Sequence, residues 1–242
     1  MEFLQPGADD DGTNERRIPA TERVLDHILD EMDAGRLGAG SRVNAARIAA
    51  TLQLSAAPVR EALSVLAGRG VLDLLPDRGA VMRPFSAAEV VQLWELVAPV
   101  AAVGLSLAAN AIIAGADPSL LEHRFAAICH NPLETGALGF ILRLNDWHAV
   151  ANEMGGNPFV GIILDRLGVA YWDRYLVQLI DVPANVDGYI TNYRRMHEAV
   201  MAGDARGAAA IVHYHGEWSS ALVNAAEAAR PGRKGRRGRS TR

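Results

Sequence analysis

The chain has 242 residues, half of them hydrophobic, and carries a formal net charge of −4. This length and apolar content exclude a disordered protein and favour two domains over one. A single cysteine, Cys129, excludes an intramolecular disulfide and a cysteine-based metal cluster.

The two ends of the chain differ from the rest in composition. Acidic residues stand in the first 14 positions, where a secretory signal would carry basic ones, and no run of 18 or more consecutive apolar residues follows. We therefore expect a cytoplasmic protein without membrane contact. Residues 1–17 and the basic residues 230–242 lack the apolar content of a core, so we expect disordered tails. The basic tail either adds weak phosphate contacts or has no role.

Charge is unevenly distributed between these tails. From Arg36 to Arg83, seven arginines stand against three acidic residues, whereas from Ala87 to Ala229 fifteen acidic residues outnumber seven arginines. A basic module joined to an acidic one is typical of a DNA-binding domain attached to a domain that does not touch DNA.

The first module, residues 18–85, has the pattern of three helices and a hairpin. Apolar residues at helical spacing predict a helix over 21–34, a second capped by Asn44 and a third capped by Ser55. Two short apolar runs then flank Pro-Asp-Arg-Gly, which favours a turn between antiparallel strands. The order predicts a winged helix-turn-helix.

The third helix carries the residues best suited to contact DNA. Opposite its buried stripe it presents Ala57 and Arg60 near its N-terminal end, the end that enters the major groove in such domains. Arg60 can reach a guanine edge or a phosphate, and Arg78 and Gly79 at the hairpin tip can approach the sugar-phosphate backbone. The alternatives are that Arg60 pairs with a surface carboxylate and that the hairpin tip is only a turn.

The second module, residues 86–229, shows no strand pattern. Long apolar-periodic segments predict about six helices packed as an antiparallel all-α bundle, so the fold class is mainly α. The predicted helical segments are 87–114, 118–129, 133–154, 158–180, 184–202 and 204–229.

The stretch LSAAPVREALSVLAGRGVL, within residues 40–81, resembles the DNA-binding half of GntR-type regulators, whose usual wording is S-R-x-P-V-R-E-A-L-x-x-L followed by G-L. The resemblance implies DNA contacts from Ser55, Ala57, Arg60 and Gly79. Arg47 is added because it adjoins a position where the family often carries arginine. Ala56 replaces the arginine that usually follows the serine, so the operator sequence does not transfer.

Two later segments, HAVANEMGGNPF (148–159) and AGDARGAAAIVHYH (202–215), resemble the FadR-like subgroup, whose FCD-type helical domain binds an effector. Many such domains hold a metal at four positions that fall here on Leu144, His148, Tyr193 and His215. Leucine cannot ligate a metal, so this resemblance disfavours a tight divalent ion. Zinc, nickel or manganese would have to use His148 and His215, and no other cofactor is expected.

We expect the effector pocket to lie around these positions. Asn145 and His197 are shifted substitutes for the missing ligands, and Val97 stands in a stretch where the family often carries charge, which favours a more apolar effector. The predicted pocket residues are Val97, Leu144, Asn145, His148, Tyr193, His197 and His215.

The sequence as a whole predicts a homodimeric transcription regulator, acting as a repressor, that binds double-stranded operator DNA and a small molecule. One alternative is a regulator whose sensor domain is vestigial and binds no ligand. A remote alternative is a metal-dependent enzyme, but no intact set of metal ligands is readable, so we expect no enzyme activity.

Overall fold

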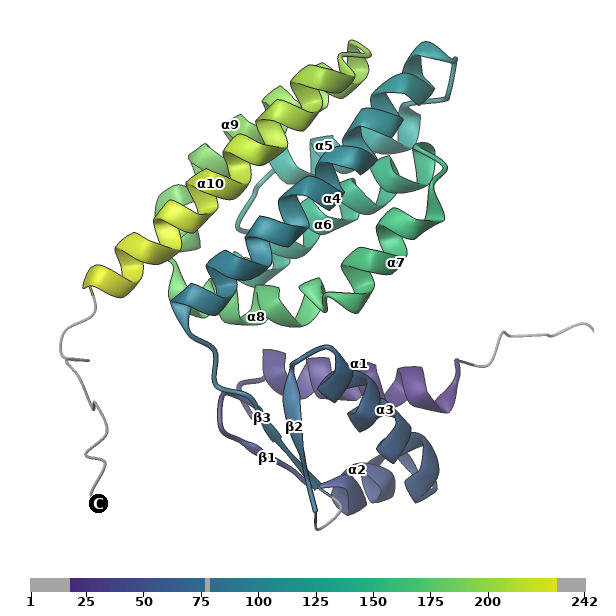
Figure 1. The fold of residues 1–242 in the computed structure, drawn as a ribbon, viewed down its shortest axis with the longest axis vertical. Coiled ribbons are helices and arrows are strands. Elements are labelled where there is room, and N and C mark those ends of the chain that lie inside the picture. Colours follow the sequence, from purple (N-terminus) through teal and green to yellow (C-terminus); the bar gives the residue numbers. More distant parts are fainter. Residues whose placement is uncertain (1–17, 77–78, 230–242) are drawn as a thin grey trace, which may run out of the picture.

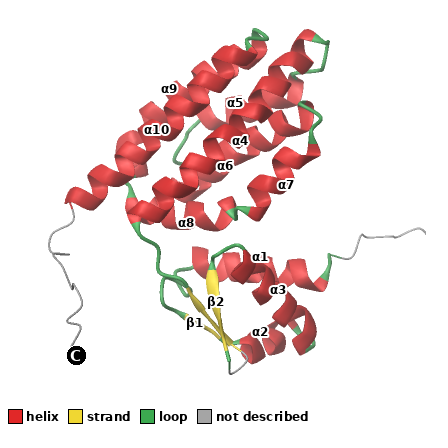
Figure 2. Cartoon of the chain, viewed as in Figure 1, coloured by secondary structure: helices red, strands yellow, loops and turns green. Residues whose placement is uncertain are grey.

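The computed structural model describes residues 18–76 and 79–229, which form a small domain with a sheet and a larger helical domain (Figure 1). The strands are confined to the small N-terminal domain (Figure 2). The predicted fold class, a mainly helical chain with an N-terminal winged helix-turn-helix and a C-terminal bundle, is confirmed. Both predicted tails and Arg78 lie outside the described residues.

The N-terminal domain packs three helices against a three-stranded antiparallel sheet of order β1-β3-β2. Its elements are α1 (Ala20–Asp33), β1 (Arg42–Val43), α2 (Ala45–Leu52), α3 (Ala56–Gly68), β2 (Leu72–Leu75) and β3 (Gly79–Met82).

Local sequence signals explain the helix-turn-helix. The side chain of Asn44 accepts a hydrogen bond from the backbone N–H of Arg47, which caps α2. Gln53 then adopts a left-handed conformation, with φ of 54°, and turns the chain toward α3. Ser55 precedes α3 but makes no side-chain cap hydrogen bond, in contrast to the prediction. Val59 and Leu66 of α3 are fully buried and fix which face of this helix points outward.

The C-terminal domain is a bundle of seven helices rather than about six. Its elements are α4 (Ala87–Ile113), α5 (Ser119–Cys129), α6 (Gly136–Met154), α7 (Pro158–Arg166), α8 (Val169–Leu179), α9 (Val182–Met201) and α10 (Ala205–Ala229). The segment predicted as one helix over 158–180 is divided because Gly168 takes a φ of 71°, a conformation open to glycine, and ends α7.

Helix α4 is the central element of the bundle and begins at a capping box formed by Ser86 and Glu89. It packs against α6, α9 and α10. By length and composition α4 could also cross a membrane, a property it shares with core helices of other folds. The largest fully buried side chain of the bundle is Trp147 of α6.

Candidate DNA-binding surface and ligand cavity

The predicted DNA-contact residues of the helix-turn-helix lie at the surface. Ser55, Ala57 and Arg60 are exposed at the beginning of α3, and Arg47 is exposed on α2. In Figure 1, α2 lies at the end of the domain farthest from the bundle, and β2 extends from the bundle side toward that end. This end is therefore open to a large partner.

Arg23 of α1 donates to the carbonyl oxygen of Leu52, and the other described arginines of the N-terminal domain fall into two groups. Three form ion pairs, Arg36 with Glu31, Arg69 with Asp165, and Arg83 with Glu89. By contrast, Arg42, Arg47 and Arg60 are exposed and form no ion pair with another described residue. These three come from β1, α2 and α3. Their charges are available to phosphate groups.

Gly79, the predicted wing contact, has a structural role that the sequence did not reveal. It begins β3 and pairs with Leu75 of β2. A Cβ atom at Gly79 would lie 3.2 Å from the carbonyl oxygen of Val43 in β1. The glycine thus lets β3 approach β1 closely at the end of the hairpin next to its turn.

A cavity of about 590 Å³ lies in the bundle and is partly open to solvent; residues of α4, α6, α7, α9 and α10 line it, with the start of α8 at its edge. Helix α4 contributes an apolar wall, because Trp94, Val97, Ala98 and Ala101 follow the i, i+3, i+4, i+7 spacing of one helix face. The volume lies within the range of about 300–1,000 Å³ that is typical of small-molecule sites.

Helix α6 contributes a polar wall to the same cavity. Asn145, His148 and Asn152 stand at i, i+3 and i+7, so their side chains share one face. Nδ1 of His148 and Oδ1 of Asn152 are buried and have no hydrogen-bond partner among the described residues. The Asn152 amide fits because residue 104 of α4 is glycine, where a Cβ atom would lie 1.9 Å from that oxygen.

Two further polar side chains, Tyr193 and His215, come from α9 and α10. Their ring centres lie 5.4 Å apart, and Nδ1 of His215 accepts a hydrogen bond from Nδ2 of Asn192 at 3.2 Å. Burial lowers the pKa of His148 to about 4 and that of His215 to about 3, so both imidazoles are neutral at pH 7.

Five of the seven predicted pocket residues line this cavity: Val97, Asn145, His148, Tyr193 and His215. The other two lie elsewhere. Leu144 is 2% exposed and packs in the bundle core, because it precedes Asn145 by one residue and so points to another face of α6. His197 stacks on Phe125 and accepts a hydrogen bond from Trp147.

Several residues that line the cavity were not among those predicted from the sequence. They are Trp94 and Ala101 of α4, Asn152 of α6, Asp165 of α7 and Tyr171 of α8. Of these, Asn152 could have been found, because it lies four residues after His148 on a predicted helix.

The side chains at the family's metal positions do not fit a metal ion. No described group of three or more His, Cys, Asp or Glu residues is arranged to hold one. Burial raises the pKa of Tyr193 well above its usual value, which disfavours a phenolate ligand. Asn145 donates instead to Asp173 of α8, at 2.5 Å between Nδ2 and Oδ2, and His197 is engaged outside the cavity.

One residue of the DNA-binding domain touches the cavity wall. Arg69, directly after α3, donates from Nη2 to Oδ2 of Asp165 at 2.5 Å. Its guanidinium carbon also lies 6.0 Å from the centre of the Tyr171 ring. Asp165 and Tyr171 both line the cavity. Asp165 and Tyr171 therefore contact both the cavity and the residue that directly follows α3.

Helix α8 makes a second set of contacts with the N-terminal domain. Nη2 of Arg174 donates to Oδ2 of Asp33, the last residue of α1, at 2.7 Å. The Phe85 ring lies 3.9 Å from that of Trp172 and 4.0 Å from that of Tyr175, between ring centres. These aromatic contacts hold the interdomain segment against α8.

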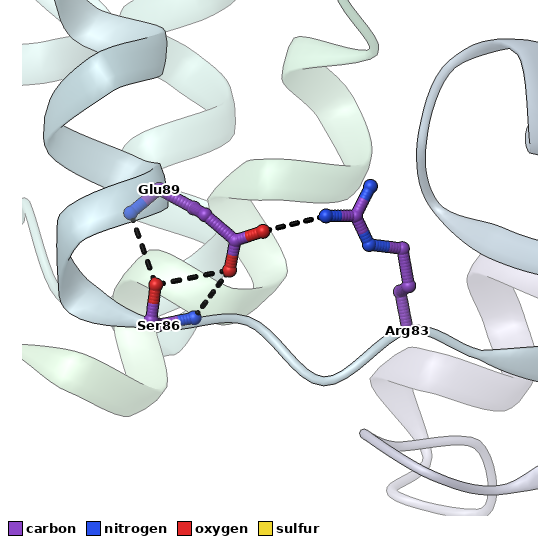
Figure 3. Close-up of polar contacts among 3 residues, drawn as sticks. All are labelled: Arg83, Ser86 and Glu89. Atoms are coloured by element: carbon purple, nitrogen blue, oxygen red, sulfur yellow. Dashed lines mark hydrogen bonds and ion pairs between the residues drawn. The ribbon is translucent and has the colours of Figure 1, made fainter.

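The interdomain segment is also fixed by hydrogen bonds, as Figure 3 shows. Nη2 of Arg83 donates to Oε1 of Glu89 at 2.6 Å, and the other carboxylate oxygen of Glu89 accepts from the backbone N–H of Ser86 at 2.9 Å. The end of β3 is thereby joined to the first turn of α4.

Comparison with known proteins identifies the N-terminal domain. Residues 20–82 match the family described as bacterial regulatory proteins, gntR family. Two curated sequences from strains of Mycobacterium tuberculosis, each described as an uncharacterized HTH-type transcriptional regulator, are 33% identical over 79 residues, which are 33% of this chain. That stretch spans 32% of those relatives, about a third of their length. The match to the gntR family is thus confined to the N-terminal domain.

Solved structures match over both domains. Escherichia coli McbR/YncC superposes with a TM-score of 0.70 at 20% identity, over 86% of this chain and 98% of that one. A transcriptional regulator from Rhodococcus sp. RHA1, described as GntR, gives a TM-score of 0.68 at 18% identity, over 85% of this chain and 97% of that one. At these identities the likeness shows a common fold.

Proposed function

We propose that this chain is a cytoplasmic transcription regulator that binds operator DNA through its gntR-family domain and responds to a small molecule in the cavity of its bundle. The observation that carries the proposal is the position of Arg69. This residue directly follows α3, which we propose as the recognition helix, and contacts both Asp165 and Tyr171 of the cavity wall. A ligand that displaces either side chain moves the anchor of α3.

The ion pair between Arg69 and Asp165 orients α3 relative to the bundle and contributes little to the stability of the fold. The Asp165 side chain is 65% exposed, and exposed ion pairs contribute little to folding. Its loss on ligand binding is therefore a small cost, while the orientation of α3 relative to the bundle changes. A regulator needs such a difference in contacts between its two states.

We also propose a homodimer, because a pseudo-palindromic operator is bound by two copies of one helix-turn-helix. Leu96 and Val103 are 58% and 49% exposed and lie seven residues apart on α4, which makes an apolar stripe suited to a second copy. The paired change Leu96→Lys and Val103→Glu should convert a dimer into a monomer in light-scattering chromatography. Ile163→Glu, at an exposed apolar position on α7, is the matched control.

Repression is the mode we propose, on the resemblance of the chain to GntR-type regulators. The vestigial-sensor alternative is disfavoured by a cavity of about 590 Å³ with unpaired polar atoms in its wall. A metal-dependent enzyme is disfavoured because the described residues contain no set of three metal-ligating side chains.

Selection from a pool of random DNA duplexes tests the DNA-binding part of the proposal. The unchanged protein should enrich one pseudo-palindromic sequence at physiological salt. Arg60→Ala should lose this enrichment, whereas Arg36→Ala, which breaks the ion pair with Glu31, should keep it. Enrichment of the same sequence by Arg60→Ala would contradict the assignment of α3 as the recognition helix.

A further inference from the structure

We propose that the cavity binds an uncharged, largely apolar organic molecule that carries hydrogen-bonding groups along one edge, facing His148 and Asn152. The inference rests on the proposed sensor role of the bundle and deepens it by naming the class of ligand. Three properties of the wall support it: an apolar side, a polar side, and the absence of a cation among the described lining residues.

The apolar side sets the body of the ligand. Trp94 presents an indole ring, and Ala98 and Ala101 next to it leave space because their side chains are small. A flat or branched hydrocarbon skeleton gains most from this surface, since burial of apolar area is favourable wherever water is displaced. Val212 of α10 extends the same surface.

The polar side sets the ligand's hydrogen bonds. Nδ1 of His148 and Oδ1 of Asn152 are one turn apart on α6 and both lack a partner. Buried polar atoms are almost always hydrogen-bonded in folded proteins, and both side chains line the cavity, so a bound molecule toward which they turn would satisfy them. Because a side-chain amide both donates and accepts, the ligand can pair with Asn152 through a carbonyl, hydroxyl or N–H group.

Charge excludes an anionic ligand. Among the described lining residues there is no lysine or arginine, and the imidazoles of His148 and His215 are held neutral by burial. The two lining carboxylates, Glu153 and Asp165, are exposed, and Asp165 is paired with Arg69. A carboxylate or phosphate in the interior of the cavity would lose its hydration without meeting a counter-charge, because Arg69 lies outside the lining and is paired with Asp165.

A pair of probes of equal shape tests the inference. The two probes share a naphthalene ring, but 2-naphthamide carries an uncharged amide where 2-naphthoate carries a carboxylate. Both can be titrated into the full chain by calorimetry. We expect 2-naphthamide to bind at least about tenfold more tightly, because only the carboxylate is desolvated without a partner. Equal or tighter binding of 2-naphthoate overturns the inference, as does failure of 2-naphthamide to bind at millimolar concentration.

Two variants locate the probe. Asn152→Ala should weaken 2-naphthamide by about three- to tenfold, because one hydrogen bond to the ligand is lost. Ala149→Arg places a guanidinium at an exposed position of the cavity wall and should reverse the preference toward 2-naphthoate. Ala149→Gln, of similar length and without charge, should keep the order of affinities. An unchanged preference in Ala149→Arg would place the probe outside this cavity and overturn the inference.

Because these titrations contain no DNA, they fail separately from the proposed function. A chain that prefers 2-naphthamide but enriches no DNA sequence would refute the proposed regulator and leave the ligand class standing. A chain that enriches an operator but prefers 2-naphthoate would refute the ligand class and leave the proposed regulator standing.

Discussion

The two domains place their polar side chains in opposite ways. In the N-terminal domain, Arg42, Arg47 and Arg60 carry charge on the surface and form no ion pair with a described residue. In the bundle, His148 and Asn152 line a cavity and are neutral, and Nδ1 of His148 and Oδ1 of Asn152 are buried without a partner among the described residues. Exposed positive charge can bind a large polyanion such as DNA. Neutral groups that line a cavity can bind a small molecule that loses its hydration.

The largest effect is expected where the surface charge is removed. Changing Arg47 and Arg60 together to alanine should weaken DNA binding by about 10–100-fold and should make the affinity less dependent on salt, by about one unit of slope per lost phosphate contact. Fluorescence anisotropy across a salt series measures both quantities. Arg195→Ala, an exposed arginine of the bundle that lies over the Tyr214 ring, is the control and should leave them unchanged.

A smaller effect is expected where the cavity residue Asn152 packs against Gly104 of α4. Gly104→Ala forces a Cβ atom against the Asn152 amide and should lower the free energy of unfolding by about 1–3 kcal/mol. The matched control is Gly161→Ala on α7, where a Cβ atom meets no atom within 4 Å and better helix propensity should stabilise slightly. Equal chemical-denaturation curves for the two variants would mean that the Asn152 amide moves freely.

A pH-dependent effect is expected next to the cavity. Burial raises the pKa of Asp173 to about 7, although the hydrogen bond from Asn145 opposes this shift. In the unfolded chain the carboxyl is ionised at lower pH, so its contribution to stability is lost as pH rises from about 4 to about 7. Asp173→Asn removes this loss and should raise the melting temperature by an amount that grows up to pH 7 and is constant above it. A gain that does not change with pH would contradict the raised pKa.

How far the sequence predicts this molecule depends on whether the signal is local. The Asn44 cap, the buried stripe of α3 and the turn at Gln53 involve neighbours in sequence, so the DNA-binding fold followed directly. The break at Gly168 was missed because apolar periodicity continues on both sides of it.

Contacts between elements that are distant along the chain could not be predicted from the sequence. Arg69 and Asp165 are 96 residues apart and meet only because the bundle docks against α3. In the sequence alone, nothing distinguishes Arg69 from the other basic residues of the DNA-binding domain. In the same way, the placement of His197 outside the cavity depends on the packing of Phe125 against it, which no spacing along the chain reveals.

The central claim is that the cavity and the recognition helix are linked through Arg69, and one titration tests it most directly. DNA affinity is measured with and without saturating 2-naphthamide, for the unchanged protein, for Arg69→Ala and for Arg36→Ala. We predict that the probe shifts DNA affinity by about 5-fold or more in the unchanged protein and in Arg36→Ala. Arg69→Ala should still bind both DNA and probe, with the shift reduced to near one. A shift of the same size in Arg69→Ala would contradict the claim.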